Sequence, residues 1–168
     1  MLTIPPPLTG YLGKRIDAIC PFSLGTKHGE NHCAHFVSHA MGYDFATTCK
    51  NLSSADKQRP EIGASIRVDE IFNVTYDFGP WAKRPTSLTS CLIFVTNSGN
   101  MGWGNCRLEM RKGPKKHIGI YVNGVVWHYS NRGDKVVNEA EMLFINKFTR
   151  EYKTAGQTVE FFYGRFLK

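Results

Sequence analysis

The sequence predicts an α+β fold in which N-terminal helices, one of them carrying a reactive cysteine, pack on an antiparallel sheet. Three features indicate it: a helical pattern over about 32–41, a buried-strand pattern, CLIFV, at 91–95, and a hairpin pattern, HIGIYVNGVVWHYS, at 117–130. Helices that precede a block of strands are typical of α+β domains. The chain has 168 residues, the usual length of one domain, so we expect a single domain over 1–168.

The other elements follow from local signals. Residues 1–10 contain three consecutive prolines and are expected to form an irregular arm, while a short helix is expected over 13–20. The helix over 32–41 should end at Gly42. Residues 43–62 are expected to be mostly loop, followed by a helix that is capped by Ser65 and reaches Val74. The strand at 91–95 is followed by an inserted loop over 97–115 and then by the hairpin. A helix over 138–149 and a closing strand over 158–166 complete the chain.

The hairpin can be placed in register from its turn. Asn123-Gly124 is the preferred two-residue type I′ turn. With that turn, one face carries only apolar or aromatic residues and should face the core: Ile118, Ile120, Val122, Val125, Trp127 and Tyr129. The other face carries His117 and His128, roughly 7–8 Å apart between backbones. Gly119 is expected to leave open space between the two imidazoles.

Cys33 lies in the first turn of the predicted helix, within ENHCAHFVSHAMGY. Unpaired N–H groups and the helix dipole favour thiolate at such a position. If the apolar face of this helix meets the hairpin that carries the imidazoles, Cys33 can approach His117. The result would be a thiolate–imidazolium nucleophile, with His128 as the orienting group and the N–H of Cys33 as one oxyanion donor.

These residues together resemble the NlpC-type and CHAP papain-like cysteine peptidases, which are bacterial cell-wall amidases and endopeptidases. The likeness rests on a cysteine that opens a helix, the run HIGIYVNG, and a second histidine eleven positions after the first, and it covers about 25–45 and 90–131. It implies a papain-like fold in which Cys33 is the nucleophile, His117 the base and His128 the orienting residue.

Two details qualify the resemblance. The chain has His32 before the cysteine, where relatives usually have Asp or a Gln-like residue, and His35 where they have glycine. HCAHFV also resembles the Asn-Cys-x-His-Phe helix of lecithin–retinol acyltransferase-like proteins. In those proteins the cysteine helix follows the histidine strand, whereas in this chain it precedes the strand, which favours the peptidase branch.

The resemblance implies a cysteine hydrolase that cleaves an amide in peptidoglycan stem peptides through an acyl-enzyme, with no cofactor and no metal. A net charge of +7 and a pI of about 9.2 suit an anionic wall polymer, and no nucleic-acid-binding motif is present. The chain shows no signal-peptide pattern and no membrane-spanning run. We therefore expect a monomer that is cytoplasmic as synthesised, or exported without such a signal to act on the cell wall. A phage lysin and a secreted effector toxin, the latter with a protein inhibitor as partner, both fit.

Alternative functions remain open at this level. His32, His35 and His39 lie close to one helix face and, with Cys33, could bind a metal, because histidines at i and i+4 are a known ligand spacing. The chain would then be a metal-binding or non-catalytic binding module. An acyltransferase or an amidase acting on protein or lipid substrates is a further possibility.

The remaining cysteines and tryptophans are expected to be structural. Five cysteines are an odd number without regular spacing, which fits free thiols. Those other than Cys33 are assigned to the framework: Cys20, Cys49, Cys91 and Cys106. Of the three tryptophans, Trp103 in the glycine-rich GWGN run is expected to be the most exposed.

Overall fold

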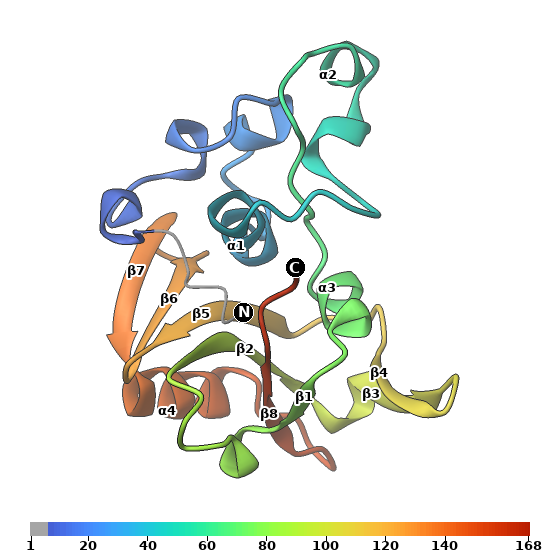
Figure 1. The fold of residues 1–168 in the computed structure, drawn as a ribbon, viewed down its shortest axis with the longest axis vertical. Coiled ribbons are helices and arrows are strands. Elements are labelled where there is room, and N and C mark those ends of the chain that lie inside the picture. Colours follow the sequence, from blue (N-terminus) through green and yellow to red (C-terminus); the bar gives the residue numbers. More distant parts are fainter. Residues whose placement is uncertain (1–6) are drawn as a thin grey trace.

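The computed structural model describes residues 7–168 and confirms the α+β class (Figure 1). Its main sheet has six strands in the order β1-β8-β2-β5-β6-β7, and every neighbouring pair is antiparallel. A separate two-stranded sheet, β3-β4, occupies part of the 97–115 segment that was expected to be a loop. Of the arm expected over 1–10, residues 1–6 lie outside the described part of the chain.

The elements have the following bounds. The α-helices are α1 (Cys33–Met41), α2 (Ser54–Lys57), α3 (Val68–Val74) and α4 (Glu141–Glu151). The strands are β1 (Phe78–Pro80), β2 (Ser90–Asn97), β3 (Met101–Gly104), β4 (Arg107–Met110), β5 (Lys116–Val122), β6 (Val125–Ser130), β7 (Lys135–Ala140) and β8 (Val159–Gly164). Short 3-10 turns are η1 (Thr9–Tyr11), η2 (Ile16–Ala18), η3 (Ser23–Thr26), η4 (Cys49–Leu52), η5 (Trp81–Lys83) and η6 (Ser98–Asn100).

The β5–β6 hairpin has the predicted register. Ile120 pairs with Trp127, and Val122 pairs with Val125. Asn123 and Gly124 have φ values of 48° and 88°, the left-handed conformation that a type I′ turn requires at both central positions. The turn therefore places His117 and His128 on the same face of the sheet, as expected.

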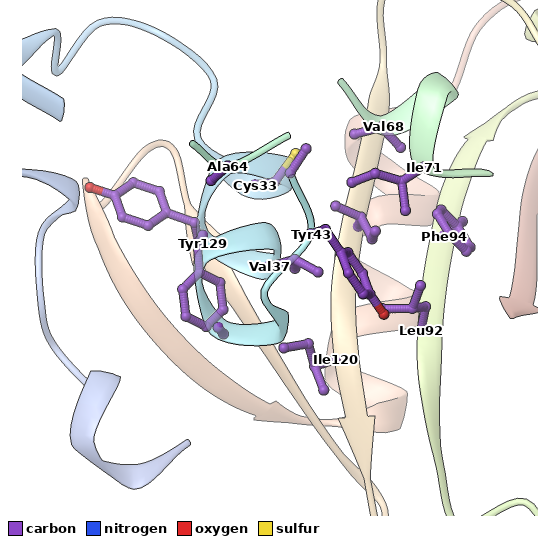
Figure 2. Close-up of a cluster of buried hydrophobic side chains, with 14 of the residues drawn as sticks. Cys33, Val37, Tyr43, Ala64, Val68, Ile71, Leu92, Phe94, Ile120 and Tyr129 are labelled. Atoms are coloured by element: carbon purple, nitrogen blue, oxygen red, sulfur yellow. The ribbon is translucent and has the colours of Figure 1, made fainter. Parts of the chain in front are cut away.

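Each face of the sheet is covered by a different helix. On one face, α1 packs against β5 and β6 in a core that includes Ile118 and Ile120, and α3 closes this side (Figures 1 and 2). On the other face, α4 contributes Phe144 and Phe148 to a second cluster over β2 and β5. The apolar face of α1 thus meets the hairpin that carries the two histidines, but the imidazoles themselves lie on the opposite face, under α4.

Several element boundaries differ from the prediction for identifiable reasons. The helix expected over 13–20 is only the turn η2, and α4 begins at Glu141 because residues 135–140 extend the sheet as β7. Ser65 does not cap a helix: its hydroxyl donates to the carbonyl of Phe45 and accepts from the N–H of the same residue. Among the described residues, no helix combines the length and the apolar character needed to cross a membrane.

Candidate active site

Cys33 is the first residue of α1, and its side chain lies at the end of the helix beside Val68 of α3 (Figure 2). Only 1% of the residue is exposed. Burial raises the pKa of its thiol to about 11, and the N–H groups of Ile118, Ala34 and Cys33 itself oppose this only in part. The thiol is therefore neutral at rest. The predicted thiolate was wrong because the cost of burying a charge exceeds the effect of the helix terminus.

The two histidines of the hairpin contact each other directly. Nε2 of His117 lies 2.9 Å from Nδ1 of His128, and both residues are 1% exposed. Phe148 of α4 stacks on His117, with ring centroids 4.4 Å apart. Gly119 does not leave open space, since a Cβ built there would lie 2.7 Å from Cγ1 of Val126. The pair is thus an enclosed unit.

Glu139 of β7 joins this pair and was not identified from the sequence. Its Oε1 lies 3.3 Å from Nε2 of His128, without the alignment of a well-formed hydrogen bond, and the same carboxylate forms an ion pair with Lys147 of α4. The residue could not be placed by sequence because β7 itself was not predicted. Had a strand been predicted after the hairpin, its pairing would have pointed to Glu139. His128 pairs with Val137, so Glu139, two residues further on, lies diagonal to His128 on the same face.

The electrostatics of the three groups are set by burial and by one another. Burial, followed by the neighbouring His128 and Lys147, holds the pKa of His117 well below its usual value. Burial also lowers the pKa of His128, although Glu139 opposes this. The contact with His128, followed by that with Lys147, lowers the pKa of Glu139 to about 2. At neutral pH the site therefore holds two neutral imidazoles and one carboxylate.

Cys33 and His117 approach β5 from different sides. The thiol lies against the N–H of Ile118, the residue that follows His117. Within residues 7–168, no hydrogen bond joins the thiol to either imidazole. Nδ1 of His117 is buried and has no hydrogen-bond partner in this part of the chain. The structure thus brings the two histidines into contact and places the thiol beside the same stretch of strand, one residue from His117.

A small pocket reaches Cys33 from the surface. Its volume is about 180 Å³, and its lining consists of Asn31, Cys33, Ile66, Arg67, Val68, Asp69, Pro114, Lys115 and Lys116. The Cys33 N–H, expected to be an oxyanion donor, donates to Oδ1 of Asn31 at 3.1 Å. A larger pocket of about 740 Å³ near Trp103 is lined by none of the predicted site residues. Of these two pockets, the small one is thus the one that Cys33 lines.

The histidines of α1 are arranged differently from the predicted metal site. His35 and His39 lie next to each other, but the cysteines near them are Cys20 and Cys49. His32 is hydrogen-bonded to His35 through their Nδ1 atoms at 3.1 Å. Cys33 is not part of this cluster.

Comparisons with known proteins identify no relative: no family model, no curated protein and no solved structure matches this chain.

Proposed function

We propose that this chain is a papain-like cysteine hydrolase that cleaves an amide bond in peptidoglycan stem peptides. Cys33 is the nucleophile, His117 the general base and His128 the residue that orients it. The observation that carries this proposal is the order of contacts from Glu139 through His128 to His117, which leaves Nδ1 of His117 without a partner among the described residues, while the Cys33 thiol lies against the N–H of the next residue, Ile118.

The contacts determine which nitrogen carries each proton. A carboxylate only accepts hydrogen bonds, so Glu139 favours a proton on Nε2 of His128. Nδ1 of His128 then accepts from Nε2–H of His117. The lone pair of His117 is consequently on Nδ1, where a base acting on the Cys33 thiol needs it.

The reaction follows from these positions. The thiol transfers its proton to Nδ1 of His117 as the sulfur attacks the carbonyl carbon, giving a tetrahedral oxyanion. The C–N bond then breaks, and His117 returns the proton to the leaving amine. Nδ1 of His117 then takes a proton from a water molecule as that water attacks the thioester carbon. The C–S bond breaks, His117 returns the proton to the Cys33 sulfur, and the carboxylic acid is released. The imidazolium that forms in each half-reaction is stabilised through His128 by the charge of Glu139.

Two adjustments accompany substrate binding in this mechanism. Cys33 packs in the core on the α1 face of the sheet and the His117 imidazole lies on the α4 face, so the mechanism requires a rearrangement on substrate binding that brings the thiol to Nδ1 of His117. The substrate carbonyl oxygen must take the place of Oδ1 of Asn31 at the Cys33 N–H, which then acts as an oxyanion donor. Asn31 lines the same pocket, so its side chain remains next to the substrate.

The pocket limits the kind of substrate. A volume of about 180 Å³ is below the roughly 300–1,000 Å³ of most small-molecule sites, so it accepts only the groups next to the scissile bond. Three basic residues and one acidic residue line it: Arg67, Lys115, Lys116 and Asp69. An excess of positive charge favours a peptide that carries carboxylates close to the cleaved amide, as stem peptides do. Action at the cell wall is part of this proposal.

Digestion of purified peptidoglycan tests the proposal. Wild-type protein should release new muropeptides, identified by mass spectrometry, and Cys33→Ala should release none. Cys106→Ala is the matched control because this cysteine is exposed and remote from the pocket, and it should match the wild type. Equal activity of Cys33→Ala and wild type would overturn the assignment of Cys33 as the nucleophile. The assignment of peptidoglycan as substrate would be overturned if wild type were inactive on several wall chemistries and hydrolysed a protein or lipid amide in a Cys33-dependent way.

A further inference from the structure

A second cluster of reactive side chains lies along α1 and does not include the imidazole pair of His117 and His128. Its ligand-type atoms all lie within 4.8 Å of one another. We name it the Cys2His2 cluster, and its members are Cys20, His35, His39 and Cys49. Three of these residues are buried and His39 is partly exposed, so the cluster is enclosed but has an opening beside one ligand.

We propose that the Cys2His2 cluster is a structural zinc site. Two thiolates and two imidazoles are the donor set that Zn²⁺ takes in closed four-ligand sites, and the other common divalent ions prefer harder or differently arranged donors. This inference is independent of the hydrolase proposal because it involves neither Cys33 nor His117.

The distances are those of a tetrahedral site. Nε2 of His35 and Nε2 of His39 are 3.2 Å apart, and Sγ of Cys49 lies 3.9 Å from Nε2 of His39. With Zn–N near 2.0–2.1 Å and Zn–S near 2.3 Å, tetrahedral geometry requires nitrogens about 3.3 Å apart and a sulfur–nitrogen separation of about 3.6 Å. The side chains therefore already stand at nearly the spacing that one ion would impose.

Hydrogen bonds outside the cluster direct a lone pair into it. Nε2 of His32 lies 2.8 Å from the carbonyl oxygen of Lys27, which can only accept, so His32 carries its proton there. Nδ1 of His32 then accepts from Nδ1–H of His35, 3.1 Å away. Nε2 of His35 is left unprotonated and faces His39 and the sulfurs. An outer partner that fixes the tautomer of a ligating histidine is a regular feature of zinc sites.

The cysteines also have the surroundings of bound thiolates. The N–H of Ala64 donates to Sγ of Cys49 at 3.2 Å. The N–H groups of Phe22 and Gly25 lie against the sulfur of Cys20. N–H donors of this kind stabilise sulfur that carries negative charge.

The ion would connect three segments that are distant in sequence. Cys20 follows η2, Cys49 opens η4, and the two histidines are one turn apart on α1. Such a bridge fixes α1, the helix that carries Cys33 at its start, to the loops on both sides of it. The role we assign to the zinc is therefore to hold this part of the fold together.

Metal analysis of the full chain, purified with reductant and equilibrated with zinc, tests the site. We expect about one tightly held zinc per chain in wild type and a loss of most of it in Cys20→Ser and Cys49→Ser. Cys91→Ser is the control for a buried cysteine elsewhere in the fold. Cys33→Ser is the control for a cysteine on α1, the helix that carries His35 and His39. Both should retain the ion. Loss in Cys33→Ser with retention in Cys20→Ser and Cys49→Ser would overturn this ligand set.

A second measurement keeps the test valid if the ligand variants do not fold. Wild-type protein stripped with a chelator should melt at a lower temperature and regain its melting temperature on addition of zinc. Cobalt(II) added in place of zinc should give the intense visible bands of a tetrahedral site together with thiolate-to-cobalt charge transfer. Folded wild type that takes up neither ion, or that contains a Cys20–Cys49 disulfide after purification with reductant, would overturn the proposal.

Discussion

Glu139, His128 and His117 form one proton network across three neighbouring strands. The carboxylate favours a proton on Nε2 of His128, and Nδ1 of His128 then favours a proton on Nε2 of His117. The same burial that keeps both imidazoles neutral also makes their charging costly. Single side chains in this network therefore affect both the proposed chemistry and the stability of the fold.

Substitutions along the network should reduce turnover in a graded order. His117→Ala should lower kcat by about 10²–10⁴-fold because it removes the base. His128→Ala and Glu139→Gln should have smaller effects, roughly tenfold to a hundredfold, because they disturb only the orientation and charge of His117. Steady-state rates on a soluble muropeptide would measure this, with Glu160→Gln as the control. A Glu139→Gln variant with unchanged kcat would remove Glu139 from the network.

The buried imidazoles should make stability depend on pH. Their folded-state pKa values lie below the unfolded value of about 6.5, so the unfolded chain binds more protons in acid. The associated stability is complete above about pH 6.5 and falls as the pH decreases, by at most about 1.4 kcal/mol per pH unit for each group. Glu139 and Lys147 face the pair from β7 and α4, and the anionic Glu139 moderates the loss at His128.

Urea unfolding of the metal-loaded protein between pH 8 and pH 5 would measure this dependence. A His117→Leu/His128→Leu double variant should show a flatter profile than wild type over the same range. Profiles of equal slope would show that other groups control the acid sensitivity of the fold.

At the level of elements, the β5–β6 hairpin was predictable in detail because its register depends on local chemistry. Asn123-Gly124 fixes the turn, and strict alternation then assigns every side chain to a face. The sequence could not show which helix covers which face of the hairpin, because both faces are covered. The strand before α4, β7, also has little hydrophobic pattern of its own, so the position of α4 could not be predicted. The start of α1 was predicted to within one residue, but the burial of Cys33 depends on α3 and β5 and left no local signal.

Gly119 gives a direct test of the packing between β5 and β6. An added Cβ would meet Cγ1 of Val126 at 2.7 Å and the carbonyl oxygen of Trp127 at 3.1 Å. Gly119→Ala should therefore destabilise the protein by about 1–3 kcal/mol, the usual cost of overpacking. Adding Val126→Ala should restore only part of the lost stability, because it removes the side-chain clash but leaves the contact with the carbonyl oxygen of Trp127.

Chemical denaturation of the two single variants and the double variant would give the coupling between these positions. If Gly119→Ala were as stable as wild type, the hairpin would have more room than the structure shows.

Across the whole molecule, the sequence predicted the fold class better than the details of the site. The α+β class followed from the order of helical and strand patterns, and Trp103 is 80% exposed, as expected. The Cys2His2 cluster could not be assembled from spacing, because its cysteines come from two loops without regular periodicity. His35, which departs from the glycine of the resembling family, belongs to that cluster.

The net charge of +7 should make association with the cell wall depend on salt. Exposed charges are screened over about 10 Å at 0.1 M salt, so binding of the Cys33→Ala variant to intact sacculi should weaken steadily as salt is added. A sedimentation assay would measure the bound fraction, and cleavage of a short soluble muropeptide by wild type should change less. Salt-independent binding to sacculi would show that contacts other than charge dominate.

Trapping the covalent intermediate would identify the nucleophile. Wild-type protein turning over a soluble muropeptide can be quenched in acid and digested, and its peptides can be examined by mass spectrometry. We expect an acyl adduct on the peptide that contains Cys33, absent from Cys33→Ala and strongly reduced in His117→Ala. An adduct on another cysteine, or continued turnover by Cys33→Ala, would contradict it.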